Sequence, residues 1–128
     1  MGRLTGLIEL HVMNNQLDKR PDTVVQLTAL RKLDLQGNRL TSLPNSIGGL
    51  SALTDLNLRY NRLSSLPNSL ARLSNLRFLD LRANQLSSLP EGLAELPQLQ
   101  KLDLRWNRLS SPPACLCRLT ARGCIVYA

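Results

Sequence analysis

The sequence predicts an α/β solenoid, in which one short motif recurs and each copy adds a strand to a parallel sheet. First, the 128-residue chain repeats itself five times at intervals of 23 residues, without insertion or deletion. Second, each copy contains an alternating stretch such as Leu33-Asp34-Leu35, typical of a strand with one buried face. Third, 43% of the residues are hydrophobic but only 3% are aromatic, so the core must be aliphatic.

The repeats share leucine columns at fixed positions. We place the copies at 7–29, 30–52, 53–75, 76–98 and 99–121, beginning at Leu7, Leu30, Leu53, Leu76 and Leu99. Two further columns form the buried face of the strands, and they are Leu10, Leu33, Leu56, Leu79 and Leu102, and Val12, Leu35, Leu58, Leu81 and Leu104. One strand cannot bury its apolar face alone, so the copies must stack on one another.

An asparagine and a proline follow each strand at constant spacing. The asparagines are Asn15, Asn38, Asn61, Asn84 and Asn107. We expect a structural role for them, with the amides satisfying backbone groups that the turn leaves unpaired in their own and the next repeat. The prolines fix φ, and we expect a short helical or 3-10 turn after each one, as over residues 45–52.

The two ends depart from the pattern. Residues 1–6 form a partial repeat without an obvious polar cap, so we expect either an exposed first strand or a piece of a longer protein. Arg122 replaces the leucine that would open a further copy, and Ile125 and Tyr127 occupy the two inward columns. Residues 122–128 are therefore expected to form a capping strand, which makes residues 1–128 a single domain.

The motif L-x-x-L-x-L-x-x-N-x-L, followed by L-P, resembles the leucine-rich repeat family in its 23-residue variety, and the resemblance covers essentially the whole chain. It implies a curved, right-handed solenoid with one short parallel sheet on the concave face and short helical or 3-10 turns on the convex side. It also implies a non-catalytic scaffold or recognition module, as in the intracellular signalling and bacterial effector members of the family.

Three ladders of outward-facing residues cross the expected concave face. They are Glu9, Lys32, Asp55, Phe78 and Lys101; His11, Asp34, Asn57, Asp80 and Asp103; and Met13, Gln36, Arg59, Arg82 and Arg105. Five cations and five carboxylates share these ladders, so the face is about neutral although the chain carries a net charge of +7. Beside the third ladder run Asn14, Gly37, Tyr60, Ala83 and Trp106.

We expect a protein partner to bind this face. Phe78, Tyr60 and Trp106 would be apolar anchors, since aromatic residues and arginine are enriched at binding hot spots. Arg59, Arg82 and Arg105 would pair with acidic groups of the partner, and Asp80 and Asp103 would orient them. The ladders can also be read as solvated columns without a partner, and Trp106 as a cover for the last repeat.

Two other binding modes stay open. The turn edge carries Arg39, Arg62 and Arg108 with no acid in that column, so nucleic acid or another polyanion could bind there, with steep salt dependence. A concave nucleic-acid groove is disfavoured because carboxylates interrupt the basic residues. The unpaired first strand near Leu4 and Leu7 could instead support self-association.

The residues that carry chemistry are few. His11 is the single histidine, and arginines adjoin the acidic column and depress the pKa of its carboxylates, so we expect no enzyme. Cys115, Cys117 and Cys124 provide three of the four ligands that zinc requires, so we expect no metal and no cofactor. We interpret these cysteines as small apolar packing residues under the cap, with a disulfide from Cys115 or Cys117 to Cys124 as the alternative.

The remaining expectations concern location. No apolar run approaches the ~20 residues of a transmembrane helix, and residues 1–11 lack the apolar stretch of a signal peptide. We therefore expect no membrane association and a cytoplasmic location, or, as an alternative, a bacterial effector delivered to a host cell.

Overall fold

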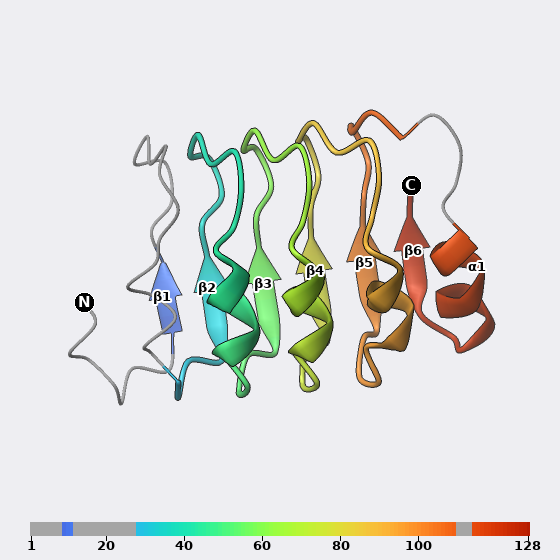
Figure 1. Ribbon diagram of the computed structural model, residues 1–128, viewed down its shortest axis with the longest axis horizontal. Helices are drawn as coiled ribbons and strands as arrows, with labels where there is room; N and C mark the ends of the chain where they lie inside the picture. The colour runs from blue at the N-terminus through green and yellow to red at the C-terminus, as the bar shows by residue number, and fades with distance from the viewer. Residues whose placement is uncertain (1–8, 12–27, 110–113) are drawn as a thin grey trace.

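The computed structural model describes residues 9–11, 28–109 and 114–128, and it shows a solenoid built on one sheet (Figure 1). Six strands lie parallel, and their order in space is their order in the sequence. The strands are β1 (Glu9–His11), β2 (Lys32–Asp34), β3 (Asp55–Asn57), β4 (Phe78–Asp80), β5 (Lys101–Asp103) and β6 (Ile125–Tyr127). The predicted parallel sheet of a repeat solenoid is confirmed.

The register of the sheet follows the 23-residue repeat from β1 to β5. Leu10 lies opposite Leu33, and Leu33 lies opposite Leu56. The same leucine column continues through Leu79 to Leu102. Because the side chains of a strand alternate between faces, all flanking residues of the strands point to the other face of the sheet. We call that face, which carries the three ladders, the concave face.

Short 3-10 helices cover the opposite, convex side, as predicted. They are η2 (Asn45–Gly49), η3 (Asn68–Arg72) and η4 (Glu91–Glu95). A proline in extended conformation precedes each helix, and its carbonyl accepts the first hydrogen bond, as from Ile47 N to Pro44 O at 3.1 Å. The helices pack so closely that a Cβ on Gly48 would lie 2.5 Å from Ser69 O of the next repeat, so glycine is required there.

The core lies between the sheet and these helices and consists almost entirely of leucine. Leu30, Leu53 and Leu76 are completely buried, as are Leu58 and Leu81 beside them. Cores of this kind lose about 2–5 kcal/mol for each leucine that is shortened to alanine. The large number of equivalent leucines therefore holds every strand, and with it every ladder, at a fixed position.

The asparagine column ties successive repeats together. The Asn61 amide donates to Leu58 O in its own repeat at 3.0 Å and to Leu35 O in the preceding one at 2.9 Å, while its oxygen accepts from Leu40 N at 3.1 Å. Asn84 and Asn107 repeat this pattern.

Each of these asparagines bonds to its own repeat and to the preceding one. This corrects the sequence-based prediction, which gives its own repeat and the next one. Leu35 O and Leu40 N both bond to the side-chain amide of Asn61, which belongs to the following repeat. Asn15 lies outside the described residues.

The C-terminal end differs from the prediction by one residue. Val126, not Ile125 or Tyr127, continues the inward column, since β6 pairs Leu102 with Val126 and leaves Ile125 and Tyr127 55% and 40% exposed. The helix α1 (Ala114–Ala121) replaces the shorter 3-10 turn, and Gly123 closes it with a φ of 88°. This longer connection shifts the last strand by one position relative to the repeat.

Candidate functional site

The concave face brings the predicted ladders together as three rows that run across the strands. Lys32, Asp55, Phe78 and Lys101 lie opposite one another along the first row. His11, Asp34, Asn57, Asp80 and Asp103 form the second row, and β6 adds Ile125 to the first row and Tyr127 to the second. Gln36, Arg59, Arg82 and Arg105 follow two residues later, where each strand ends.

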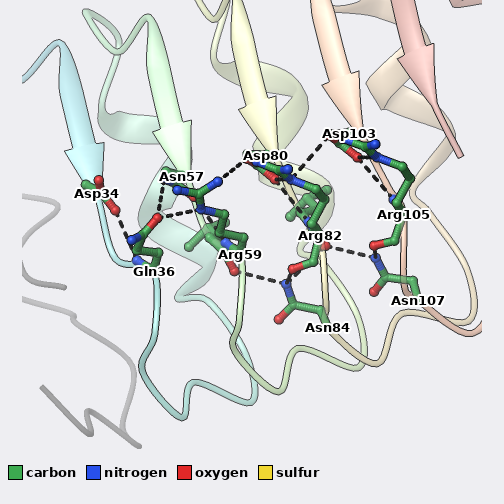
Figure 2. A network of polar contacts seen from close by, with 12 residues as sticks. Asp34, Gln36, Asn57, Arg59, Asp80, Arg82, Asn84, Asp103, Arg105 and Asn107 are labelled. Carbon is green, nitrogen blue, oxygen red and sulfur yellow. Dashed lines mark hydrogen bonds and ion pairs between the residues drawn. The ribbon is translucent and has the colours of Figure 1, made fainter. Parts of the chain in front are cut away.

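The arginines of the third row are bound by carboxylates of the second (Figure 2). Arg82 forms a two-pronged contact with Asp80 of its own strand, through Nε to Oδ1 at 3.0 Å and through Nη2 to Oδ2 at 2.7 Å. Two residues along a strand share one face, which places this pair side by side. The hydrogen bond to Asp80 raises the pKa of Arg82 further above its ordinary value, so the guanidinium stays charged.

Asp103 is the centre of the network. It accepts from Arg105 Nε at 3.0 Å and from Arg105 Nη2 at 2.7 Å, and its Oδ2 lies 3.2 Å from Arg82 Nε of the preceding repeat. Burial, which leaves 3% of the residue exposed, opposes ionisation, but the bonds from Arg105 and the charge of Arg82 outweigh it and lower the pKa of Asp103 below its ordinary value. Asp103 is therefore a charged structural group, not a proton donor.

The network weakens toward the N-terminal repeats. Arg59 Nη1 lies 4.0 Å from Asp80 Oδ2, and Arg59 Nε donates to Gln36 Oε1. Asn57 takes the place of an aspartate and donates to the same Gln36 oxygen at 3.0 Å. The concave arginines are thus engaged within the chain, although the sequence pattern had assigned them to acidic groups of a partner.

A hollow of about 310 Å³ lies on the concave face beside this network. Its lining comes from the first two rows and the leucines beneath them, and it includes His11, Lys32, Asp34, Asp55, Asn57, Phe78, Asp80, Lys101 and Asp103. Of the predicted binding residues, the structure places Phe78, Asp80 and Asp103 in this hollow. It does not place Arg59, Tyr60, Arg82, Arg105 or Trp106 in its lining.

Tyr60 and Trp106 lie instead where the chain leaves the sheet. Both have positive φ, 58° and 62°, and so has Ala83 between them, at 55°. The amides of Tyr60 and Ala83 bond across repeats in the same way, from Tyr60 N to Arg82 O and from Ala83 N to Arg105 O, each at 3.0 Å. Tyr60 is 54% and Trp106 63% exposed. Gly37 shares this left-handed conformation, with a φ of 72°, so the repeat sets the backbone at this position whatever side chain it carries.

Tyr127 is a functional candidate that the sequence pattern missed. Its ring contacts two cations of the neighbouring strand segment, with Arg105 Cζ at 4.9 Å and Lys101 Nζ at 5.4 Å from the ring centre. The inward column of the repeat had assigned Tyr127 to the core. Gly123, a residue that often ends a helix, was the signal that the last connection is longer than the others.

The remaining reactive residues are separated from one another. Within the part of the chain that the structure describes, His11 pairs with two carboxylates, with Nε2 at 3.2 Å from Glu9 Oε1 and Nδ1 at 3.8 Å from Asp34 Oδ2. Cys117 is an exposed free thiol, which differs from the expected packing role, and Cys124 is a buried free thiol whose pKa burial raises. Among the described residues no group of histidine, cysteine and acidic side chains is arranged to hold a metal ion.

Some predictions fall outside the described residues. These include the self-association edge at Leu4 and Leu7 and the first members of two columns, Met13 and Asn14. Of the helices that the structure describes, none is long and apolar enough to cross a membrane.

Comparison with known proteins agrees with this architecture. A sequence model of the family described as leucine rich repeat matches residues 5–63, 28–86 and 53–109. The chain is similar to a solved structure of a leucine-rich repeat protein from Leptospira interrogans, with a TM-score of 0.79 and 31% sequence identity over 99% of this chain. The chain spans only 38% of the length of that protein. No curated protein matches the chain.

Proposed function

We propose that this chain, which belongs to the leucine-rich repeat family, is a non-catalytic module that binds a protein partner on its concave face. Repeats of this family are generally protein-interaction modules. The observation that carries the proposal for this chain is the hollow beside Phe78, which combines an exposed aromatic ring with charged groups on a rigid sheet.

The surface around the hollow is already ordered. Asp80, Arg82, Asp103 and Arg105 hold one another through charged hydrogen bonds, and the leucine core fixes the strands beneath them. A preformed surface loses little conformational entropy when a partner binds. The network therefore supports binding by holding the floor of the site, while other residues contact the partner.

The first row offers the groups that a partner would contact. Phe78 is 41% exposed, and Lys32 and Lys101 on either side of it form no ion pair with a carboxylate among the described residues. Asp55 carries one described side-chain contact, a hydrogen bond from Thr54 Oγ1 at 2.8 Å. A partner with an apolar side chain flanked by carboxylates would complement this row.

Catalysis is not part of the proposal. Asp80 and Asp103 face arginines, and the pKa of Asp103 is lowered, which is the opposite of what a general acid needs. The described ion-pair partners of His11 are two carboxylates, the exposed Glu9 and the partly buried Asp34. We also propose a cytoplasmic location, or delivery to a host cell by a bacterium.

Affinity capture from a nuclease-treated lysate of the source cells tests the proposal. We expect Phe78→Glu to reduce the retained protein at least tenfold, because it places a charge at the centre of the apolar contact. Arg72→Glu, on the convex helix η3, is the matched control and should retain the partner. Equal retention by wild type and Phe78→Glu would exclude the hollow as the binding site.

A further inference from the structure

We propose a second binding surface on this protein: the strand-exit edge binds single-stranded nucleic acid. The strand-exit edge is the row of turns formed by residues 37–43, 60–66, 83–89 and 106–109, which follow β2, β3, β4 and β5 and the third row of the concave face. In this proposal Tyr60 and Trp106 stack on bases, and Arg62 and Arg108 contact the phosphates. None of these four residues lines the concave hollow.

The arginines of this edge differ from those of the concave face in that their charges are available. Arg62 N and Arg108 N donate to Leu40 O and Leu86 O of the preceding repeats, each at 2.8 Å, so the backbone is fixed. Their side chains are exposed and form no hydrogen bond or ion pair with any residue that the structure describes, and the same holds for Arg39.

No carboxylate lies in the turns of the strand-exit edge. The four segments contain arginine, glutamine, serine and asparagine but neither aspartate nor glutamate. The acidic residues that flank the segments along the chain are Asp34, Asp80, Glu91 and Asp103. Asp80 and Asp103 are occupied by Arg82 and Arg105, and Glu91 begins the convex helix η4. The positive potential at the edge is therefore not cancelled locally, which is the electrostatic condition for binding a phosphate backbone.

The aromatic residues of the edge supply the base-stacking surface that the proposal requires. Tyr60 lies two positions before Arg62, and Trp106 lies two positions before Arg108, so each of these two turns carries an exposed ring and an exposed arginine. The centre of the Trp106 ring also lies 5.9 Å from Arg105 Cζ, and the residue is 63% exposed. At ~4.8 Å per strand, the two rings are about 10 Å apart along the edge, with the small Ala83 between them. Surfaces that bind single strands combine such base-stacking rings with cations that follow the backbone.

A duplex fits this arrangement less well than a single strand. In a duplex the base faces are stacked inside the helix, and only single-stranded bases offer a free face to a side chain. Rings that are 54% and 63% exposed gain little from contacting phosphates alone. The stacking contact therefore distinguishes single strands from a general polyanion.

Titration with labelled 12-nucleotide oligo-U and oligo-dT, followed by fluorescence anisotropy, tests the proposal. Trp106 is the one tryptophan of the chain, so its own fluorescence reports stacking at this position. We expect binding to quench Trp106. Arg62→Gln with Arg108→Gln should weaken binding at least tenfold and reduce the slope of log affinity against log salt by about 1.4, since each single-strand phosphate contact contributes about 0.7.

Two further variants separate stacking from charge. Tyr60→Ala should weaken oligonucleotide binding about fivefold or more, yet leave the binding of heparin, an anion without bases, unchanged. Arg72→Gln, on the convex side, and Phe78→Glu, in the hollow, should bind oligonucleotide like wild type. Circular dichroism of each variant verifies that it is folded.

The opposite results would overturn the proposal. These are heparin competing as tightly as oligonucleotide with no quenching of Trp106, equal losses from Arg72→Gln and from the edge variants, or no binding of either oligonucleotide at about 50 mM salt. Since Phe78→Glu reports on the hollow and the edge variants on the turns, failure here is distinguishable from failure of the protein-binding proposal.

Discussion

The arginines of the concave face and the arginines of the strand-exit edge come from the same repeats, yet they differ in their contacts. Arg82 and Arg105 lie two residues after an aspartate on the same face of a strand, and each binds that aspartate through two nitrogens. Arg62 lies three residues after Arg59, and Arg108 three residues after Arg105, in turns that contain no carboxylate. The side chains of the first set are held by carboxylates, and those of the second set have no ion-pair partner among the described residues.

This difference shows that net charge is a poor guide to where a ligand binds. The chain carries +7, and both sets of arginines contribute to that number equally. Only the contacts tell which cations already have a counter-ion. Three experiments test the distinction, in order of decreasing effect.

Removal of the central carboxylate should have the largest effect. Asp103→Asn leaves Arg105 and Arg82 without their nearly buried partner, and charged hydrogen bonds of this kind are worth about 2 kcal/mol. We expect urea unfolding to show a loss of about that size in the free energy of unfolding.

Asp55→Asn is the control for this experiment. Asp55 has one described hydrogen-bond partner, Thr54, and its replacement should cost less than about 0.5 kcal/mol. Equal losses for the two variants would mean that the network does not stabilise the fold.

The pH dependence of stability should reflect the same carboxylate. The pKa of Asp103 is lowered in the folded state relative to its ordinary value, so the unfolded chain binds a proton at higher pH than the folded one. This contribution to stability is present above the ordinary pKa and is lost as pH falls through the folded pKa.

Urea midpoints measured from about pH 6 down to about pH 3 check this expectation. Wild type should lose more stability on acidification than Asp103→Asn, which has no carboxylate to protonate. Parallel curves for the two proteins would contradict the link between the network and the lowered pKa.

The smallest effect should come from comparing single arginines. Arg82→Gln breaks the contacts to Asp80 and Asp103 and should lower the free energy of unfolding by about 1 kcal/mol, since the site is partly exposed. Arg62→Gln touches no described ion pair and should stay within about 0.5 kcal/mol of wild type. Should Arg62→Gln prove as destabilising as Arg82→Gln, the two sets of arginines would not differ in role.

Most of the fold followed from the sequence because the repeat fixes the register. Once Leu33 and Leu56 are in equivalent positions, so are Asp34 and Asn57, and every row of the sheet follows. The register of the last strand, β6, differs from the repeat because α1 and Gly123 replace the regular turn. This shifts Tyr127 onto the concave face. A repeat predicts only those segments that obey it.

The candidate site was less predictable for a different reason. The sequence places Asp80 and Arg82 on one face, but whether the guanidinium turns toward its own strand or toward a partner depends on side-chain geometry. Likewise, the spacing places Tyr60 and Trp106 in one column without revealing that this column has a left-handed backbone. Gly37, the one glycine in that column, was the available hint.

The left-handed column also bears on how such a protein can change. Glycine, tyrosine, alanine and tryptophan occupy it at Gly37, Tyr60, Ala83 and Trp106, and all four have nearly the same φ, between 55° and 72°. The repeat therefore tolerates side chains of very different size at this one position without altering the leucine core. The residue at this position can therefore be substituted in each turn independently. Natural selection or protein design could change the surface of the edge one repeat at a time without changing the scaffold.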